Sequence, residues 1–270
     1  MTGPSVRDHW ERTGLSAEIR DALVASGRDP GALTIEDLAP FDQFHGGGLG
    51  FTRRLATLGG LAPGMAVLDV GGGLGGPART LALEFGCRVT VIDLTDSYVE
   101  AGRMLTSLIG LDDRVDFVVG DALELPFADA SFDVIWTQNS GMNIADKARL
   151  YEGFHRVLRP DGRLVTQEPM AGSVGPRIYP LMWADDDTTD HVQSPDTMLA
   201  IIQAAGFTAL AWDEVRLGPP PPDAPRPPRT IQSLVMGDDH LAAIMSASRQ
   251  NEDEGRLTMV QAVFGARATS

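Results

Sequence analysis

A glycine-rich turn that follows an apolar run is the part of this sequence best suited to chemistry. The run 67–70 (VLDV) leads into residues 71–76, where five of the six residues are glycine. Glycine turns tightly and lets a ligand approach the main chain within van der Waals distance. In an open α/β sheet such a loop lies beyond the carboxyl end of its strand, where ligands bind. The segment predicts a nucleoside-binding strand–loop–helix unit in which Gly71, Gly73 and Gly75 contact the ligand.

Two acidic residues follow at the ends of the next two predicted strands. Asp93 ends the run 89–92 at about the distance from the glycine loop at which a carboxylate accepts both ribose hydroxyls in nucleotide-binding folds. Asp121 lies between Gly120 and Ala122, where a carboxylate can accept a hydrogen bond from an adenine amino group. The alternatives are that Asp93 only caps the next helix and that Asp121 only forms a turn.

Composition narrows the class of partner. The chain has 270 residues, a formal net charge of -15 and a sequence pI of about 4.6. This balance argues against a nucleic-acid partner and against an anionic membrane surface. The single cysteine, Cys87, excludes an intramolecular disulfide and is expected to be a small buried apolar residue. Without a recognisable signal peptide or membrane-spanning run, the expected location is cytoplasmic.

Strands and helices alternate from residue 66 onward. Strands are expected at 66–70, 88–93, 115–119, 132–136, 163–167, 207–215 and 258–264, and helices at 77–84, 97–109, 147–158 and 194–205. This order predicts a parallel, doubly wound sheet with helices on both faces. Further helices are expected at 7–26, 51–59 and 230–250, with a capping box at 34–37, a turn at 159–162 and a proline-dense linker at 218–228.

The series of motifs resembles that of class I S-adenosyl-L-methionine (SAM)-dependent methyltransferases. The resemblance covers about residues 60–168 and is carried by VLDVGGGLG at 67–75, Asp93, GDA at 120–122, SFDVIW at 131–136 and RVLRPDG at 156–162. More narrowly, FDQFHGG at 41–47 and the stretch 162–169 are similar to bacterial small-molecule methyltransferases of the sarcosine/dimethylglycine and natural-product type.

The resemblance implies a Rossmann-like, doubly wound seven-stranded sheet whose last strand runs antiparallel. It implies one domain, with a helical lid at 1–60, a SAM-binding core at 61–168 and substrate-cap insertions at 169–193 and 216–255. SAM would be held by Gly71, Gly73, Gly75, Asp93, Leu94, Asp121 and Ala122, with Gln138 near its methionine end.

Methyl transfer needs little from the protein beyond holding the acceptor near the methyl carbon and excluding water. A base is required only if the acceptor atom carries a proton. The catalytic candidates are His45, Gln138 and His191, with the alternatives that His45 only positions its loop, that Gln138 is a hydrogen-bonded turn residue and that His191 lies in an exposed loop. Glu168 is either a buried base or a capping acid. The acids at 185–187 are expected to be solvated, and no metal site is expected.

The expected function is methylation of a small molecule in bacterial secondary metabolism, with an apolar metabolite favoured and the acceptor atom (oxygen, nitrogen or carbon) open. One alternative is a cyclase that has the methyltransferase fold and keeps SAM as a structural ligand. Another is a nicotinamide-dependent oxidoreductase, because Gly71, Gly73 and Gly76 also match the dinucleotide fingerprint. A homodimer is compatible with the sequence.

Overall fold

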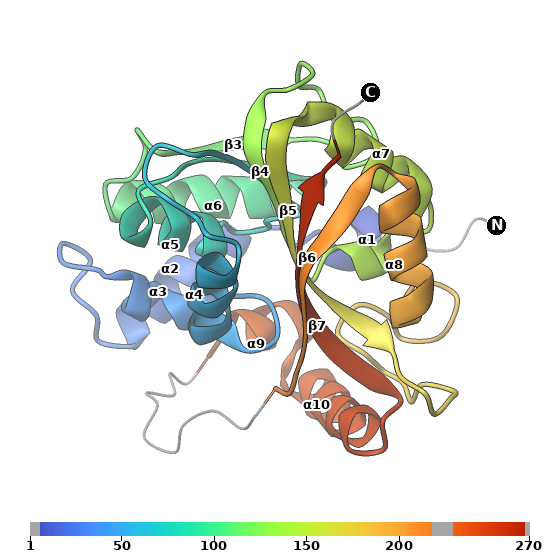
Figure 1. Ribbon diagram of the computed structural model, residues 1–270. Coiled ribbons are helices and arrows are strands. Elements are labelled where there is room, and N and C mark those ends of the chain that lie inside the picture. Colours follow the sequence, from blue (N-terminus) through green and yellow to red (C-terminus); the bar gives the residue numbers. More distant parts are fainter. Residues whose placement is uncertain (1–5, 218–228, 268–270) are drawn as a thin grey trace.

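A seven-stranded sheet forms the centre of the computed structural model, which describes residues 6–217 and 229–267 (Figure 1). The strand order is β3-β2-β1-β4-β5-β7-β6, and β7 runs antiparallel to both of its neighbours. The expected sheet with one antiparallel strand is therefore confirmed. The strands are β1 Ala66–Val70, β2 Arg88–Asp93, β3 Val115–Val119, β4 Phe132–Gln138, β5 Leu158–Ala171, β6 Phe207–Val215 and β7 Leu257–Ala266.

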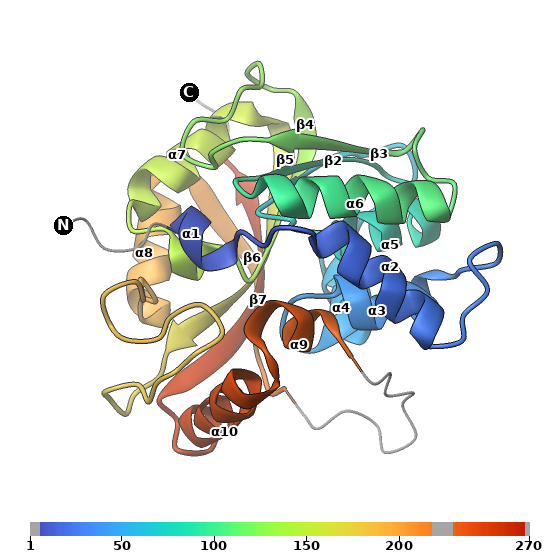
Figure 2. The same ribbon diagram turned by 180° about the vertical axis from the view of Figure 1, so that it is seen from behind.

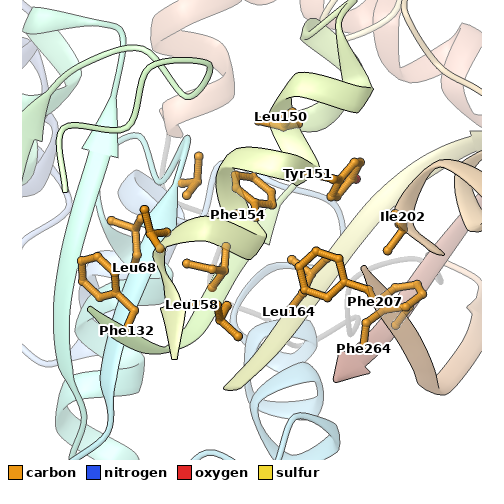
Figure 3. Packing of buried hydrophobic residues seen from close by; sticks show 14 of the residues in the cluster. Leu68, Phe132, Leu150, Tyr151, Phe154, Leu158, Leu164, Ile202, Phe207 and Phe264 are labelled. Atoms are coloured by element: carbon orange, nitrogen blue, oxygen red, sulfur yellow. The ribbon is translucent and has the colours of Figure 1, made fainter. Parts of the chain in front are cut away.

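Helices cover both faces of the sheet. One face carries α4 (Gly48–Leu58), α5 (Gly76–Glu84) and α6 (Asp96–Leu108), and the other carries α7 (Lys147–Val157) and α8 (Pro195–Ala204) (Figure 1). Figure 3 shows Leu150, Tyr151 and Phe154 of α7 packed over Leu68 and Leu164 of the sheet. Because parallel strands are buried on both faces, β1 reads as an almost continuous apolar run.

The N-terminal helices and a late segment of the chain form one further layer. This layer contains α2 (Leu15–Ala25), α3 (Ile35–Asp42) and α9 (Ile231–Met236), whose apolar side chains share a buried cluster with α6 (Figure 2). The remaining helices are α1 (Val6–Trp10), the short 3-10 helix η1 (Gly141–Asn143) and α10 (Asp238–Asp253). Segments more than 200 residues apart therefore jointly cover one end of the molecule.

Two helices that were predicted to be continuous are each broken into two. The helix expected at 7–26 is split into α1 and α2, and the helix expected at 230–250 is split into α9 and α10. Gly14 and Gly237 stand at these breaks with φ of 82° and 75°, a left-handed conformation that glycine adopts without steric cost. In both cases helical periodicity continued through a glycine and hid the change of direction.

Other local predictions are confirmed. Thr34 and Asp37 form the reciprocal capping box of α3, and the Ser194 side chain caps α8 by accepting from the Thr197 N–H. The turn expected at 159–162 is an exception, because these residues belong to β5 and form an irregularity within it: Leu158 pairs with Phe132, whereas Arg163 pairs with Val134. Cys87 is buried. The proline-dense linker lies outside the described residues.

None of the helices within 6–217 and 229–267 combines the length and the apolar character needed to cross a bilayer.

A buried ion pair joins the N-terminal layer to the glycine loop. Arg79 of α5 has no exposed surface, and its guanidinium donates to Asp42 Oδ2 at 2.8 Å and to the Leu74 carbonyl at 2.7 Å. The same guanidinium donates to the Gly102 carbonyl and to Thr106 Oγ1 of α6. One side chain thus connects α3, the glycine loop and α6.

We expect Arg79→Met to lower the free energy of unfolding by about 3–5 kcal/mol, because it leaves the Asp42 carboxylate buried without its partner. Urea unfolding followed by circular dichroism measures the change. Arg53→Met is the matched control, because Arg53 is 40% exposed and pairs with Glu36 and Glu84 at the surface. Its loss should cost about 0–1 kcal/mol. Equal losses for the two variants would contradict a structural role for the buried pair.

Candidate active site

A cavity of about 450 Å³ opens at the carboxyl ends of the parallel strands. It is lined by the loops that follow β1, β2, β3 and β4. Its other walls come from residues outside these loops, which include Trp10, Asp42, Phe44, His45, Tyr98 and His191. This is the edge of the sheet at which ligands bind in open α/β folds, and the volume lies within the range of about 300–1,000 Å³ typical of small-molecule sites. Most of the predicted site residues meet here.

The loop after β1 presents bare main chain to the cavity. Gly71 has a φ of 66°, and a Cβ atom at this position would lie 2.4 Å from Ser140 Cβ. A Cβ atom on Gly72 would lie 2.6 Å from Asp69 Cγ. Gly71 and Gly73 line the cavity as expected, whereas Gly75 does not: it begins α5 with a φ of 75° and faces Phe117. Gly75 therefore shapes the turn from behind.

Asp93 lies beside this loop, and main-chain N–H groups hold both of its carboxylate oxygens. Oδ2 accepts the Gly73 N–H and Oδ1 accepts the Thr95 N–H, each at 2.9 Å. Burial raises the pKa of Asp93, and these two N–H groups act against the rise. The N-cap of α6 is Thr95, so Asp93 is not the capping residue. Each oxygen keeps a second lone pair, which leaves the carboxylate able to accept ligand hydroxyls.

The neighbouring loops supply the far end of the cavity. Leu94, Asp121, Ala122 and Leu123 line it. Asp121 Oδ1 accepts the Leu123 N–H at 2.8 Å, so the expected turn contact exists, and the other carboxylate oxygen accepts no hydrogen bond from the described residues.

The ionisable side chains that line the cavity are mainly acidic. Its lining includes Asp42, Asp69, Asp93, Asp121 and Asp146, and no lysine or arginine among the described residues. Three buried polar atoms of the lining lack a hydrogen-bond partner in that part of the chain: Asp42 Oδ1, Asp69 Oδ2 and the Tyr98 hydroxyl. Burial and the neighbouring Asp93 charge raise the pKa of Asp69 to about 8. Such groups call for a ligand with positive charge and hydrogen-bond donors.

His45 is held inside a network of neutral side chains. Its Nε2 lies 2.9 Å from Gln43 Oε1, and its Nδ1 lies 3.1 Å from both Gln138 Nε2 and the Gly46 carbonyl. Burial lowers the pKa of His45 to about 4, so the ring is neutral at pH 7. With both nitrogens engaged, His45 is arranged to orient Gln138 and the loop, which matches the positioning alternative.

A row of buried glutamines ties this loop to the sheet. Gln138, Gln167 and Gln261 are register partners on β4, β5 and β7. Gln167 Nε2 donates to the Gly46 carbonyl at 2.9 Å, and Gln261 Nε2 donates to the Phe51 carbonyl at 3.1 Å. Gln167 Oε1 accepts from the other two amides. The row therefore anchors the segment that carries His45.

Glu168 and the acidic run at 185–187 do not line the cavity. Glu168 Oε1 accepts the Gly141 N–H at 2.9 Å and the Ser140 N–H at 3.3 Å, which fixes the loop after β4. Asp185 pairs with His240 at 3.0 Å. In the part of the chain that the structure describes, no group of three or more His, Cys, Asp and Glu residues is placed to hold a metal ion.

Comparison with known proteins agrees with this geometry. A family model described as a methyltransferase domain matches residues 68–166. Methyltransferase GfsG of Streptomyces halstedii is 38% identical over 187 residues, which cover 66% of this chain and 66% of that protein. The chain is a member of the class I SAM-dependent methyltransferases.

Other relatives share shorter stretches with this methyltransferase chain. The 27-O-demethylrifamycin SV methyltransferase of Amycolatopsis mediterranei is 41% identical over 113 residues, which cover 42% of each protein. The glycine/sarcosine/dimethylglycine N-methyltransferase of Actinopolyspora halophila is 36% identical over 119 residues, or 44% of this chain and 21% of that protein. Among the first curated relatives, the matched part covers between 21% and 66% of their own length.

Solved structures show the same fold across the whole methyltransferase chain. The [4+2]-cyclase SpnF superimposes with a TM-score of 0.68 at 21% identity, covering 100% of this chain and 98% of that one. Geranyl diphosphate C-methyltransferase of Streptomyces coelicolor A3(2) superimposes with a TM-score of 0.70 at 16% identity, covering 95% and 98%. At these identities the likeness concerns the fold alone.

Several residues of the site were not found by sequence reasoning. Trp10, Asp42, Phe44 and Tyr98 line the cavity, and the first three lie in the segment before the sheet. The spacing of motifs in the sequence identifies residues that directly follow a strand. It does not show which distant helices pack over the carboxyl ends of the strands. For Gln167 the only signal in the sequence is an amide within an apolar strand.

We expect Asp93→Ala to weaken binding of S-adenosylhomocysteine by about 1.5–3 kcal/mol, the size of hydrogen bonds to a charged group. Titration calorimetry measures the dissociation constant. Asp96→Ala is the control, because the Asp96 side chain is 63% exposed and pairs with Arg7 outside the cavity. An Asp93 variant that binds as tightly as the parent would remove this carboxylate from the cofactor site.

Proposed function

We propose that this chain transfers the methyl group of SAM to a small, uncharged metabolite. The observation that carries the proposal is an acid-lined cavity against the bare main chain of the glycine loop. SAM bears a sulfonium and an ammonium group and offers ribose hydroxyls, which suit the unpartnered carboxylate oxygens of Asp42 and Asp69 and the lone pairs of Asp93. The pyrophosphate of a nicotinamide dinucleotide would instead face the carboxylates of Asp93, Asp121 and Asp146 with no described lysine or arginine beside them, which argues against the oxidoreductase alternative.

Each predicted cofactor residue has a role in this proposal. The main chain at Gly71 and Gly73 would lie against the nucleoside, and Asp93 would accept the ribose hydroxyls. Asp121, Ala122 and Leu94 would hold the adenine end, and Gln138, oriented by His45, would lie at the methionine end; Gly75 would only shape the loop.

The cofactor supplies an activated methyl group whose leaving group is neutral after transfer. The protein's part is to exclude water and to hold the acceptor. We assign the exclusion of water to Trp10 and Phe44, whose rings meet edge to face with centroids 5.5 Å apart. This supports a lid at 1–60 and a cap at 169–193 and 216–255, since His191 also lines the cavity and α9 packs on the N-terminal helices.

The walls also narrow the acceptor. SAM brings one carboxylate of its own, and no described lysine or arginine faces the cavity to neutralise a second one such as that of glycine or sarcosine. Trp10, Phe44 and Ile144 instead offer apolar surface. The similarity to GfsG and to the rifamycin methyltransferase supports an acceptor from bacterial secondary metabolism.

Incubation with SAM that carries a labelled methyl group, together with extracts of the source organism, tests this function. We expect label in a neutral product that is heavier than its precursor by one methyl-for-hydrogen exchange. A product of unchanged mass formed only in the presence of the protein would favour the cyclase alternative. Binding of NAD without binding of S-adenosylhomocysteine would overturn the proposal.

Binding of SAM should release a proton. In the free protein the Asp69 carboxyl is mostly protonated at pH 7, because burial raises its pKa to about 8. A cationic ligand favours the ionised form, so affinity should rise as the pH rises toward 8 and level off above it. Titration calorimetry in two buffers of different ionisation enthalpy measures the proton. Asp69→Asn should abolish the release, and a parent protein that releases no proton would contradict this assignment.

A further inference from the structure

Most titratable side chains in the cavity walls are already engaged. Asp42 is paired with Arg79, Asp93 accepts two main-chain N–H groups, and Asp146 caps α7 by accepting the Arg149 N–H. Each of these three carboxylates already holds a contact of the fold, although Asp42 Oδ1 and the second lone pairs of Asp93 stay open to a ligand.

Three further groups are placed unsuitably for proton uptake from an acceptor. His45 uses both ring nitrogens in contacts with Gln43 and Gln138. Asp69 lies directly beneath Gly72 of the glycine loop. Asp121 stands at the far end of the cavity, on the loop after β3.

His191 differs from all of these. It lines the cavity, and neither ring nitrogen makes a hydrogen bond to a described residue; its only polar contact is from its main-chain N–H to the Met142 carbonyl at 3.1 Å. The neighbouring Met142 and Asn143 belong to η1, and Asn143 Oδ1 accepts from Trp10 Nε1 at 3.4 Å. The imidazole therefore stands in a wall formed with Trp10 and Asn143.

The main chain that carries His191 is fixed by its neighbour Asp190. Asp190 is buried and accepts from Trp183 Nε1 at 3.0 Å, from the Tyr179 hydroxyl at 2.7 Å and from Arg177 Nε at 2.5 Å. The main chain at His191 is thus held by contacts that do not use the ring nitrogens, which leaves these nitrogens available to a ligand in the cavity that His191 lines.

Burial, helped by one charged neighbour, keeps the His191 imidazole neutral at pH 7. Burial and the Lys147 ammonium lower its pKa below the ordinary 6.5, and the Asp190 carboxylate acts in the opposite direction. Lys147 points away from the cavity, because its Nζ donates to the carbonyls of Gly141 and Ile144. Buried Glu168, beyond Lys147, accepts from the loop after β4 and does not line the cavity. At pH 7 the ring can accept a proton.

We propose that His191 is the general base of this site and that the acceptor is an uncharged metabolite that reacts through a hydroxyl group. The inference rests on the proposed methyl transfer. The acceptor oxygen forms a bond to the methyl carbon as the carbon–sulfur bond breaks, and the electron pair of that bond stays on sulfur. The hydroxyl proton passes to a ring nitrogen of His191, and the resulting imidazolium returns it to solvent after the product leaves.

A neutral acceptor follows from the wall around His191. Trp10, Phe44 and Asn143 are uncharged, and the charges of Lys147 and Asp190 are turned into the protein. A carboxylate would find no lysine or arginine among the described lining residues. The nearest lining acid in sequence to Asn143, Asp146, uses one oxygen to cap α7. A phenol or alcohol needs only the base and the apolar surface.

The test uses three probes that share a naphthalene ring: 2-naphthol, 2-(aminomethyl)naphthalene, which is an ammonium ion at pH 7, and 2-naphthoic acid, which is a carboxylate at pH 7. With labelled SAM the parent protein should methylate 2-naphthol and neither of the others. His191→Asn should slow this transfer by about 100-fold or more, the usual contribution of general base catalysis. It should also remove the loss of rate that the parent shows as the pH falls through the pKa of His191, while binding of S-adenosylhomocysteine stays unchanged.

A second readout does not depend on turnover. In protein loaded with S-adenosylhomocysteine, 2-naphthol should shift the NMR signals of the His191 ring and leave those of His240 unchanged. His240→Asn is the matched control, because His240 is 43% exposed and pairs with Asp185; its turnover should equal that of the parent.

Four outcomes would overturn the inference: methylation of the amine or the acid in place of the hydroxyl, no transfer to 2-naphthol by protein that binds S-adenosylhomocysteine, parental turnover in His191→Asn, or an unshifted His191 ring. In each of them cofactor binding and methyl transfer to another acceptor group can stand. Protein that binds neither SAM nor S-adenosylhomocysteine would overturn the proposed function together with the inference.

Discussion

The turn after β1 is the constraint on which the rest of the structure depends. Its main chain faces the cavity because groups from four directions occupy the space behind it. Ser140 packs on Gly71, Asp69 lies under Gly72, Phe117 stands behind Gly75, and the Asp42 carbonyl lies 2.4 Å from where a Cβ of Gly76 would be. A side chain at any of these positions would displace a neighbouring loop or helix. The glycines thus serve close packing on one side and ligand contact on the other.

Charge is the second organising feature. Asp42, Asp69 and Asp93 surround this main chain and line the cavity, and the first two are almost fully buried. Burying carboxylates costs free energy unless they are paired or neutralised. The buried ion pair with Arg79 offsets this cost for Asp42, and protonation of the carboxyl group avoids it for Asp69. A cationic cofactor would relieve the remaining imbalance, which couples binding to the protonation of the site.

The sequence predicted those features that depend on local patterns. The strands from β1 to β3, the caps at Thr34 and Ser194 and the acids at the strand ends were all readable, because periodicity, capping chemistry and the position of a residue after a strand are local properties. The breaks at Gly14 and Gly237 were missed, because apolar spacing continued across them. Gly75 was predicted to contact the ligand, but it lies behind the turn against Phe117. The sequence does not distinguish it from Gly73, because both are glycines of the same loop.

Contacts between residues far apart in the sequence could not be predicted from local sequence patterns. The pair between Arg79 and Asp42 spans 37 residues, and the amide contact between Gln261 and Gln167 spans 94. Both help to hold residues 42–51 beside the cavity, yet neither leaves a spacing in the sequence that identifies its partner. The same holds for Trp10, which reaches the cavity only because α1 crosses the strand ends.

The central claim is that a sulfonium nucleoside lies against the main chain of residues 71–73 with its ribose on Asp93. A crystal structure of the protein grown with saturating S-adenosylhomocysteine tests it most directly. We expect the nucleoside in that crevice, its ribose hydroxyls within hydrogen-bond distance of Asp93. A crevice that stays empty, or that is filled by side chains of the protein while the ligand binds elsewhere, would contradict the account.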